Sequence, residues 1–445
     1  MKYLSTERRK TSRFFATLPV VTSEGILGET VNINEKGVCL KLERDIEQTQ
    51  TLSLKLESPS VTLENIYLYV IWRKKIQSEK FLCGGHFLNF NKRRDLIEKI
   101  ISEYHSLNHE FIKLTCDLRT FLSEFRRKCD VFDFLNKSKE KEIEFIENNK
   151  SLLFSKLDTH FKKVWQIVKN FNKNEYKLHQ KYYQKMLLPL LKGPVETNRL
   201  VYDKPLGYSG DFIIINYFYD FHNKYIGTST YAKLINFYNC NIPIAKSVVE
   251  RKDFLKNLIL ETLNKTSVPK ILNIGSGPAK ELIELLNEGK IEKEIYFDCL
   301  DFEERALEYL RKEIDKIEET RKKKVRLRFF YKNILSLVKG EVEDLFKDYD
   351  LIYSAGVFDY LSSKIARKVI WELYKLLKKE GELLITNVKK EEVNHRVYYE
   401  MLSNWVLLPR SKDEMLKWAN GLNAKLKFEP LSDKNSFLFL SIKKV

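Results

Sequence analysis

From about residue 265 onward, short apolar strands alternate with helical segments, and this alternation constrains the fold more than any other feature of the sequence. The expected strands are KILNIG, EIYFDCLD, RLRFFYKN, YDLIYSAG and GELLITNV, followed by KLKFEPL and SFLFLSIKK. Strand–helix alternation predicts a parallel, doubly wound sheet, because each parallel connection needs a crossover that a helix supplies. No helical pattern separates the last two strands. We therefore expect a Rossmann-like sheet of seven strands that ends in an antiparallel hairpin.

Two other patterns precede this region. Residues 14–90 alternate apolar and polar positions in short runs separated by Gly, Asn and Ser, which predicts a small all-β barrel. Residues 92–192 place apolar side chains three and four apart, which indicates amphipathic helices. The predicted class is α/β with an N-terminal barrel. The predicted domains are a barrel (1–100), a helical connector (101–192) and an α/β domain (193–445, core 265–445).

The connector carries no chemical motif. Its apolar stripes fit a simple core, a lever between domains or a surface through which the chain oligomerises, and the sequence leaves these alternatives open.

Charge and cysteine content limit the classes of partner. The 445 residues include 78 basic and 61 acidic ones, for a net charge of +17. Lys and Glu occur in mixed-sign runs, so we interpret most of the charge as solvated surface and expect no nucleic-acid partner. The six cysteines form no C-x-x-C pair, so no metal site is predicted. No signal peptide or membrane-spanning run is evident, and a cytoplasmic location is expected.

The stretch NIGSGPAKE follows the first of the α/β strands and opens a helix. Gly275 and Gly277 lack side chains where a ligand would approach the backbone, and the helix start offers free N–H groups. The next strand ends in Asp301, which can accept both hydroxyls of a ribose. The third strand ends near Asn333, where a side chain could hydrogen-bond to the amino group of an adenine. A G-x-G alone also fits a dinucleotide domain or a plain structural turn, although Pro278 departs from the dinucleotide fingerprint.

These strand ends, in this order, resemble a class I methyltransferase that uses S-adenosylmethionine. The resemblance implies that the cofactor-binding residues are Gly275, Ser276, Gly277, Asp301, Asn333, Ser354 and Ala355. Four motifs narrow this resemblance to one subgroup of methyltransferases: DKPLGYSGDF, LNIGSGPAKEL, DLIYSAGVFDYL and NWVLLPRSKDEM. Together, over roughly residues 190–445, they resemble the extracellular-factor type methyltransferases of 3-hydroxypalmitic acid methyl ester biosynthesis. This implies a small-molecule acceptor, the carboxylate of a hydroxy fatty acid.

Candidate catalytic groups lie in two segments that should border the acceptor. Tyr208 and Asp211 belong to GYSGDF, and Arg396 and Arg410 follow the fifth strand. A carboxylate acceptor is already ionised at pH 7, so an arginine that orients it would suffice. Apolar residues of the same insertion would cover a fatty tail: Tyr398, Met401, Trp405, Leu407 and Leu408.

Each candidate also has a purely structural interpretation. Tyr208 and Asp211 could order a loop. Arg396 could form an i,i+4 ion pair with Glu400. Arg410 follows a proline and could cap a helix end. Taken alone, Trp405 fits the core better than a substrate wall.

The N-terminus contains a second candidate site. Arg9 and Arg13 form an R-x-x-x-R spacing before the first strand, and NINEKGV supplies Asn32, Asn34 and Gly37. Arginine suits phosphate and the acceptor edge of guanine. Gly37 permits a positive φ in a tight turn.

R-x-x-x-R followed by [D/N]-x-S-x-x-G on a six-stranded barrel resembles a PilZ domain, the bacterial receptor module for cyclic di-GMP. The likeness covers roughly residues 1–100, and Asn34 stands where the family usually has serine. The resemblance implies a cyclic di-GMP site made by Arg8, Arg9, Arg13, Asn32, Asn34 and Gly37.

The leading hypothesis is therefore a cyclic di-GMP-responsive methyltransferase. The alternatives are a non-catalytic signalling adaptor and a nucleic-acid methyltransferase. The latter is disfavoured because YSAGVFDY stands where an N-P-P-Y-type motif is expected.

Overall fold

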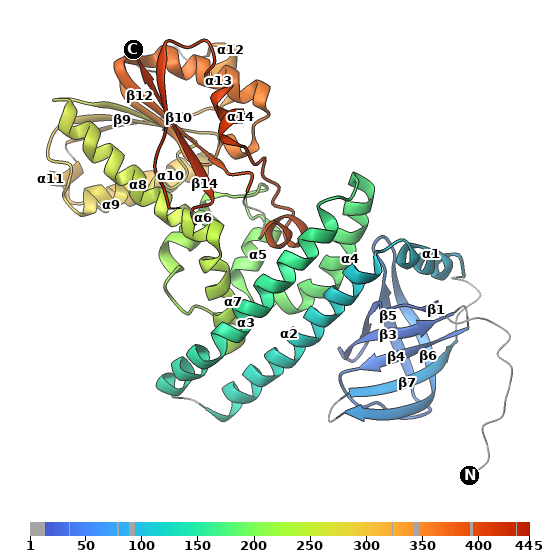
Figure 1. Cartoon of the computed structure of the whole chain (residues 1–445). Helices are drawn as coiled ribbons and strands as arrows, with labels where there is room; N and C mark the ends of the chain where they lie inside the picture. The colour runs from blue at the N-terminus through green and yellow to red at the C-terminus, as the bar shows by residue number, and fades with distance from the viewer. Residues whose placement is uncertain are drawn as a thin grey trace, which may run out of the picture. The chain divides into compact units, whose positions relative to one another are not determined.

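The computed structural model describes residues 14–34, 36–77, 80–88, 94–136, 138–322, 324–341, 345, 347–391, 395–432 and 434–445. The chain divides into two compact units (Figure 1). One comprises Met1–Ile143 and Ser151–Gly193, and the other comprises Glu144–Lys150 and Pro194–Val445.

The first unit begins with an antiparallel barrel, as the sequence predicts. Strand β3 pairs with both β2 and β4, which closes a ring in the order β3-β2-β5-β6-β7-β4, and the short β1 pairs with β3 outside this ring. Alternate side chains fill the interior, among them Val20, Leu40, Leu54 and Leu68. The strands are β1 (Phe14–Phe15), β2 (Pro19–Thr22), β3 (Leu27–Ile33), β4 (Gly37–Leu42), β5 (Thr51–Glu57), β6 (Thr62–Gln77) and β7 (Lys80–Phe87).

Four helices complete this part of the chain: α1 (Arg94–His105), α2 (His109–Leu135), α3 (Lys139–Val168) and α4 (Lys173–Leu191). Asn108, Ser138 and Asn172 cap the starts of α2, α3 and α4 through their side chains. Side-chain hydrogen bonds fix helices to the barrel: for example, the Tyr182 hydroxyl donates to the Thr17 carbonyl at 2.9 Å, and Arg119 Nη2 donates to the Gly28 carbonyl at 3.3 Å.

The second unit contains the predicted seven-stranded sheet, in the order β10-β9-β8-β11-β12-β14-β13. The first five strands of this order are parallel, whereas β14 runs antiparallel to both of its neighbours. The expected final hairpin is therefore present, with its second strand inserted beside β12. The strands are β8 (Lys270–Ile274), β9 (Ile295–Asp301), β10 (Val325–Tyr331), β11 (Tyr349–Ser354), β12 (Leu377–Val388), β13 (Ala424–Phe428) and β14 (Phe437–Lys444).

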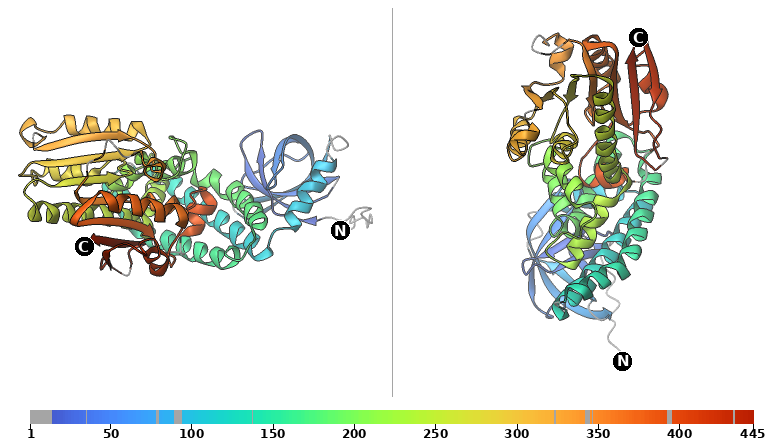
Figure 2. Two further views of the ribbon diagram at one scale, coloured as in Figure 1. Left: turned by 90° about the horizontal axis from the view of Figure 1, so that it is seen from above. Right: turned by 90° about the vertical axis from the view of Figure 1, so that its left-hand side faces the viewer.

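Helices cover both faces of this sheet (Figure 2). One face packs against α8 (Pro243–Lys265), α9 (Lys280–Asn287) and α10 (Glu304–Asp315). The other packs against α12 (Leu335–Lys339), α13 (Ser363–Leu376) and α14 (Lys412–Leu416). The shorter elements are α5 (Glu196–Asp203), α6 (Phe212–Phe221), α7 (Thr230–Asn241), α11 (Glu319–Lys322), a 3-10 turn (Phe358–Tyr360) and a π-helical turn (Val397–Leu402).

Among the described residues, no helix combines the length and apolar character that a membrane crossing requires. The same residues bring no group of three or more His, Cys, Asp and Glu side chains into a position to hold a metal ion.

Candidate active site

The glycine loop after β8 has two glycines with different roles. Both have positive φ, 65° at Gly275 and 51° at Gly277. A Cβ at Gly275 would lie 2.0 Å from Cγ2 of Val357, so this glycine lets the loop after β11 pack against it. A Cβ at Gly277 would have no atom within 4 Å among the described residues. Gly277 therefore leaves open space beside bare backbone, as the binding of a ligand requires.

Asp301 ends β9 beside this loop. Its Oδ2 accepts from the Gly277 N–H at 2.7 Å, and its Oδ1 accepts from the Glu303 N–H at 2.9 Å. Burial raises the pKa of the carboxyl group, and the backbone N–H donors oppose this shift. Two carboxylate oxygens provide about four acceptor positions, so Asp301 keeps capacity to accept from a hydroxyl of a ligand.

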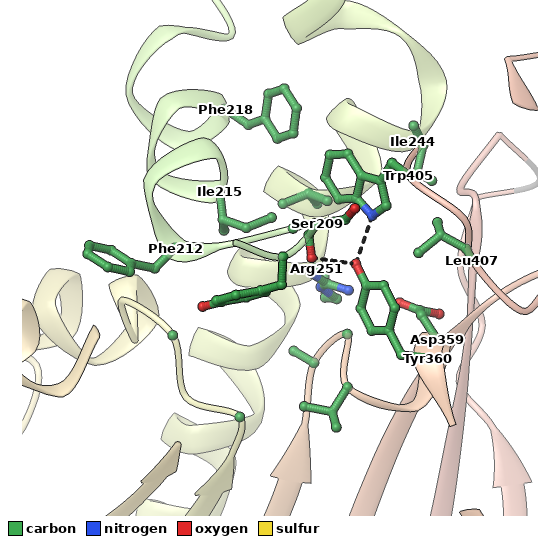
Figure 3. Close-up of a pocket in the computed structure, with 18 of the residues that line it drawn as sticks. Ser209, Phe212, Ile215, Phe218, Ile244, Arg251, Asp359, Tyr360, Trp405 and Leu407 are labelled. Carbon is green, nitrogen blue, oxygen red and sulfur yellow. Dashed lines mark hydrogen bonds between the residues drawn. The ribbon is translucent and has the colours of Figure 1, made fainter. Parts of the chain in front are cut away.

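A cavity of about 650 Å³ opens at this edge of the sheet (Figure 3). Its sheet side is formed by the loops that follow β8, β9, β10 and β11. Its opposite side is formed by α5 to α8 and the insertion after β12. That side is largely apolar, with the side chains of Phe212, Ile215, Phe218, Ile244, Trp405 and Leu407. The cavity thus joins a polar strand edge to an apolar chamber of ligand size.

One hydrogen-bonded chain links three segments of the cavity wall. Trp405 Nε1 donates to the Tyr360 hydroxyl at 2.7 Å, and that hydroxyl donates to the Ser209 carbonyl at 3.2 Å (Figure 3). Gly210 is required here, because a Cβ at this position would lie 2.5 Å from the Tyr360 oxygen. The loop before α6, the turn after β11 and the insertion after β12 are therefore held together.

The structure brings most of the predicted cofactor residues to this cavity. Ser354 is the exception: it does not line the cavity, and its Oγ donates to the Ile274 carbonyl at 3.0 Å. The Asn333 Oδ1 already accepts from the Leu335 N–H at 2.9 Å. The predicted residues that line the cavity are Gly275, Ser276, Gly277, Asp301, Asn333 and Ala355.

The predicted catalytic residues are more dispersed. Tyr208 lines the cavity, and its ring lies 4.8 Å from that of Phe302. Asp211 does not line it. Its Oδ1 accepts from the Ile213 and Ile214 N–H groups at 3.0 and 3.1 Å, so it is the N-cap of α6. The loop-ordering interpretation therefore describes its contacts.

The two predicted arginines also lie outside the cavity wall. Arg396 Nε donates to Glu400 Oε1 at 2.7 Å, the i,i+4 pair that the sequence allowed. Arg410 donates to the carbonyls of Leu361 and Pro409 at 3.1 and 3.2 Å. Trp405, by contrast, lines the cavity, and it also packs against the core of the second unit. Of the other apolar residues expected to cover an acceptor, Tyr398 and Leu407 line the cavity.

Some charged residues of the cavity wall were not singled out from the sequence, among them Arg251 and Asp359. Arg251 on α8 is only 5% exposed, and Asp359 after β11 is 4% exposed. Asp359 Oδ1 accepts from the Val388 N–H at 2.6 Å, and burial raises the pKa of its carboxyl group to about 6. Arg251 occupies the same stripe as the buried Val248 and Leu255. A charge on the apolar face of a helix was the available signal.

The candidate cyclic di-GMP residues are only partly described. Arg8, Arg9 and Arg13 lie outside the described residues. Asn34 is buried, and its Oδ1 accepts from the N–H groups of Lys36 and Gly37 at 3.0 and 2.9 Å, which forms an Asx turn.

The predicted positive φ at Gly37 is wrong, since Gly37 is not among the glycines with positive φ. Glycine is needed there because a Cβ would lie 2.2 Å from the carbonyl oxygen of Gly85 on β7. Asn32, on the neighbouring strand, pairs with Cys39 next to a β-bulge.

With this geometry in place, the comparison with known families is informative. Residues 265–427 match the family model described as "Methyltransferase domain". This part of the chain is a methyltransferase domain. S-adenosylmethionine is the cofactor of this class of enzyme, and the open space at Gly277 and the acceptor positions on Asp301 suit it. No curated protein matches the chain.

Solved structures match only partially. A possible exported protein from Bordetella parapertussis is 13% identical, with 66% of this chain and 96% of that chain covered and a TM-score of 0.40. Magnesium protoporphyrin IX methyltransferase from Synechocystis, solved with bound SAH, is 12% identical over 46% of this chain and 85% of that chain, with a TM-score of 0.35. An O-methyltransferase family protein from Burkholderia thailandensis is 16% identical over 45% and 57%, with a TM-score of 0.34.

Proposed function

We propose that the protein transfers a methyl group from S-adenosylmethionine to a small carboxylic acid with an apolar body, held in the cavity of the second unit. The observation that carries this proposal is the contact between the Gly277 N–H and the Asp301 carboxylate, which places an acceptor for ribose hydroxyls beside a backbone with open space. The cavity continues from this point into the apolar chamber, so cofactor and acceptor would share one enclosed volume.

The bound cofactor would supply a methyl group on a positively charged sulfur. The chain's own contribution is to position both reactants and to exclude water. The contacts from Trp405 to Tyr360 and from Tyr360 to Ser209 hold the wall closed around the chamber. The face of Tyr360 borders the cavity, and an aromatic face attracts a cation.

Asp359 is the residue placed to hold a proton. Its Oδ1 is fixed by the Val388 N–H, and its carboxyl group borders the cavity. With a pKa near 6 this group is mostly ionised at neutral pH, and it can take a proton from an acceptor that is not already ionised. A carboxylate acceptor would not need this step, because it loses no proton when it is methylated.

The apolar side of the cavity supports an acceptor with a hydrocarbon part. Phe212, Ile215 and Phe218 come from α6, and Trp405 and Leu407 come from the insertion after β12. A hydroxy fatty acid, the acceptor implied by the family resemblance, has this combination of apolar chain and anionic end.

Labelled cofactor gives the direct test. Purified protein is incubated with S-adenosylmethionine labelled in the methyl group and with lipid, protein and nucleic-acid fractions of cell extracts, beside an Asp301→Asn variant. We expect label in a base-labile ester of the lipid or small-acid fraction, and its loss in the variant. Label confined to protein or nucleic acid would overturn the proposed acceptor class. No transfer to any fraction, together with no binding of the cofactor, would overturn the enzyme.

We further propose that the first unit binds cyclic di-GMP. The closed barrel with an Asx turn at Asn34, reached from an arginine-rich N-terminal segment, supports this proposal. Arginine would clamp phosphate and guanine. Asn32 lies on the strand that leads into the turn and can add a hydrogen bond.

Calorimetry with cyclic di-GMP tests this second proposal. Arg9→Ala and Arg13→Ala should each abolish binding and leave affinity for S-adenosylmethionine unchanged, because the cavity is lined only by residues of the second unit. Wild-type protein that does not bind micromolar cyclic di-GMP would overturn it. An Arg73→Ala variant serves as a control, because Arg73 already pairs with Asp45 on the barrel.

A further inference from the structure

Arg251 is a buried cation that lacks a full set of partners. Its side chain borders the cavity and is only 5% exposed (Figure 3). Its Nε and Nη1 have no hydrogen-bond partner among the described residues. A guanidinium offers five N–H donors, and a buried charge without partners is costly. We therefore expect a ligand to supply the hydrogen-bond acceptors that Nε and Nη1 lack among the described residues.

An aromatic ring and two buried carboxyl groups surround the guanidinium of Arg251. Its guanidinium carbon lies 4.6 Å from the centre of the Phe437 ring, a cation–π contact. Two buried carboxyl groups lie close enough for its charge to oppose the rise in their pKa, those of Asp359 and Glu281.

Both of those carboxyl groups have other partners. Asp359 accepts from the Val388 N–H, and Glu281 Oε1 accepts from Asn273 Nδ2 at 3.0 Å and from the Tyr353 hydroxyl at 2.7 Å. Neither is recorded in an ion pair with Arg251 in the part of the chain that the structure describes.

The position of Arg251 within the cavity fits an anion at the reaction centre. The Cβ position of Gly356 lies 3.5 Å from Nη1, and Gly356 follows directly after β11. A side chain at residue 356 would touch the guanidinium, and the absence of one leaves its N–H groups open to the cavity. The guanidinium thus lies at the carboxyl edge of the sheet, where ligands bind in doubly wound folds.

We propose that Arg251 is the carboxylate-binding residue of this cavity. A carboxylate matches its planar fork, and a bidentate pair would engage Nη2 together with either Nε or Nη1, the two atoms that have no partner among the described residues. This inference rests on the proposed function and deepens it. The carboxylate has two sources in that reaction, the methionine end of the cofactor and the acid group of the acceptor. In either case Arg251 is the arginine that binds a carboxylate, a role that the sequence had assigned to Arg396 and Arg410.

The experiment compares wild type with Arg251→Gln by calorimetry against three probes. S-adenosylmethionine has the carboxylate, decarboxylated S-adenosylmethionine lacks only that group, and 5′-methylthioadenosine lacks the amino-acid part. In a fourth arm, protein saturated with S-adenosylhomocysteine is titrated with decanoate and, separately, with decanol. Arg367→Gln is the matched control, since Arg367 is exposed on α13 outside the cavity.

A cofactor source predicts that Arg251→Gln loses about tenfold to a hundredfold in affinity for S-adenosylmethionine and nothing for the two probes without the carboxylate. An acceptor source predicts unchanged affinity for all three and loss of decanoate binding in the variant. Equal affinities of wild type and variant for every carboxylate probe would overturn the inference.

Two readouts separate this result from other failures. Removal of an unpaired buried charge should leave the melting temperature of the ligand-free protein unchanged or raise it, so a large fall would mean that Arg251 is structural and would count against the inference. If wild type binds neither S-adenosylmethionine nor 5′-methylthioadenosine, the proposed function fails. The carboxylate site is then tested by titrating decanoate into wild type and Arg251→Gln without S-adenosylhomocysteine, and equal decanoate affinities would overturn it.

Discussion

The N–H of Gly277 donates to Oδ2 of Asp301 at 2.7 Å, which joins the end of β8 to the end of β9. Gly277 lies in the loop that follows β8, and Asp301 ends the neighbouring parallel strand β9, so the bond fixes the direction of the carboxylate before any ligand arrives. Such preorganisation lowers the cost of binding, because the group need not be ordered when the ligand enters.

Asp301→Asn should weaken binding of S-adenosylmethionine by about 1.5–3 kcal/mol, since charge-assisted bonds to hydroxyls become neutral ones. The variant keeps one side-chain oxygen, so one of the two backbone N–H groups that donate to Asp301 loses its acceptor, and the melting temperature should fall. Isothermal titration measures the affinity, and Glu304→Gln on the exposed surface of α10 is the control. Unchanged affinity in Asp301→Asn would remove this residue from the site.

The two glycines of the loop should respond differently to alanine. Gly275→Ala should destabilise the ligand-free protein by roughly 2–4 kcal/mol, because the new Cβ meets Val357 at positive φ. Val357→Ala in the same chain should restore part of this loss. Gly277→Ala should cost only about 1–2 kcal/mol of stability, from backbone strain, yet abolish cofactor binding, because its Cβ enters the open space. Chemical denaturation and calorimetry together measure both effects, and equal behaviour of the two variants would contradict these roles.

Asp359 should make stability depend on pH. Burial raises the pKa of this carboxyl group from 3.8 to about 6 in the folded state, so the folded chain binds the proton more tightly than the unfolded chain does. Stability is therefore lost as the pH rises between these two values, and the loss is complete above them.

Asp359→Asn keeps an acceptor for the Val388 N–H and removes the ionisation. We expect the variant to match wild type near pH 4 and to exceed it by on the order of 2–3 kcal/mol near pH 7.5. Urea denaturation of the ligand-free protein at both pH values measures this, with the exposed Asp315→Asn as control. A stability difference that does not change with pH would contradict the burial of an ionised Asp359.

Asn34 should matter to the barrel whether or not it touches a ligand. Asn34→Ala removes the acceptor for the Lys36 and Gly37 N–H groups and should cost about 1–3 kcal/mol. Asn34→Asp keeps that acceptor and should stay within about 1 kcal/mol of wild type. Thermal unfolding measures both. If cyclic di-GMP binding falls in Asn34→Ala only as much as stability does, the side chain acts through the turn.

The parts of the site that the sequence predicted are those fixed by local backbone. Gly275, Gly277 and Asp301 follow directly from strand ends, and parallel strands bring such ends to one edge whatever the details of packing. The sequence also allowed Asp211 to order a loop, and in the structure its side chain caps α6. The six-stranded barrel and the seven-stranded sheet were confirmed for the same reason, because a period of two residues and a strand–helix alternation are local signals.

The sequence did not single out Arg251 and did not decide between a core and a cavity position for Trp405, because both depend on tertiary packing. Which face of α8 turns toward the cavity is decided by the sheet and by α6, and neither is visible in the sequence around residue 251. A tryptophan in an apolar segment has the same pattern whether it fills a core or borders a chamber. The insertion after β12 became interpretable only once Trp405 was seen to donate to Tyr360.

The insertion of β14 beside β12 has a consequence for the order of folding. Val388 at the end of β12 pairs with Phe437 at the start of β14, and Phe437 is the aromatic ring beneath Arg251. This pairing closes a long loop that contains the insertion, α14 and β13. Closing the loop costs conformational entropy, and this cost arises before the contacts between β12 and β14 can offset it. The cavity should therefore be among the last features of the domain to form during refolding, and recovery of cofactor binding should lag behind recovery of helical signal.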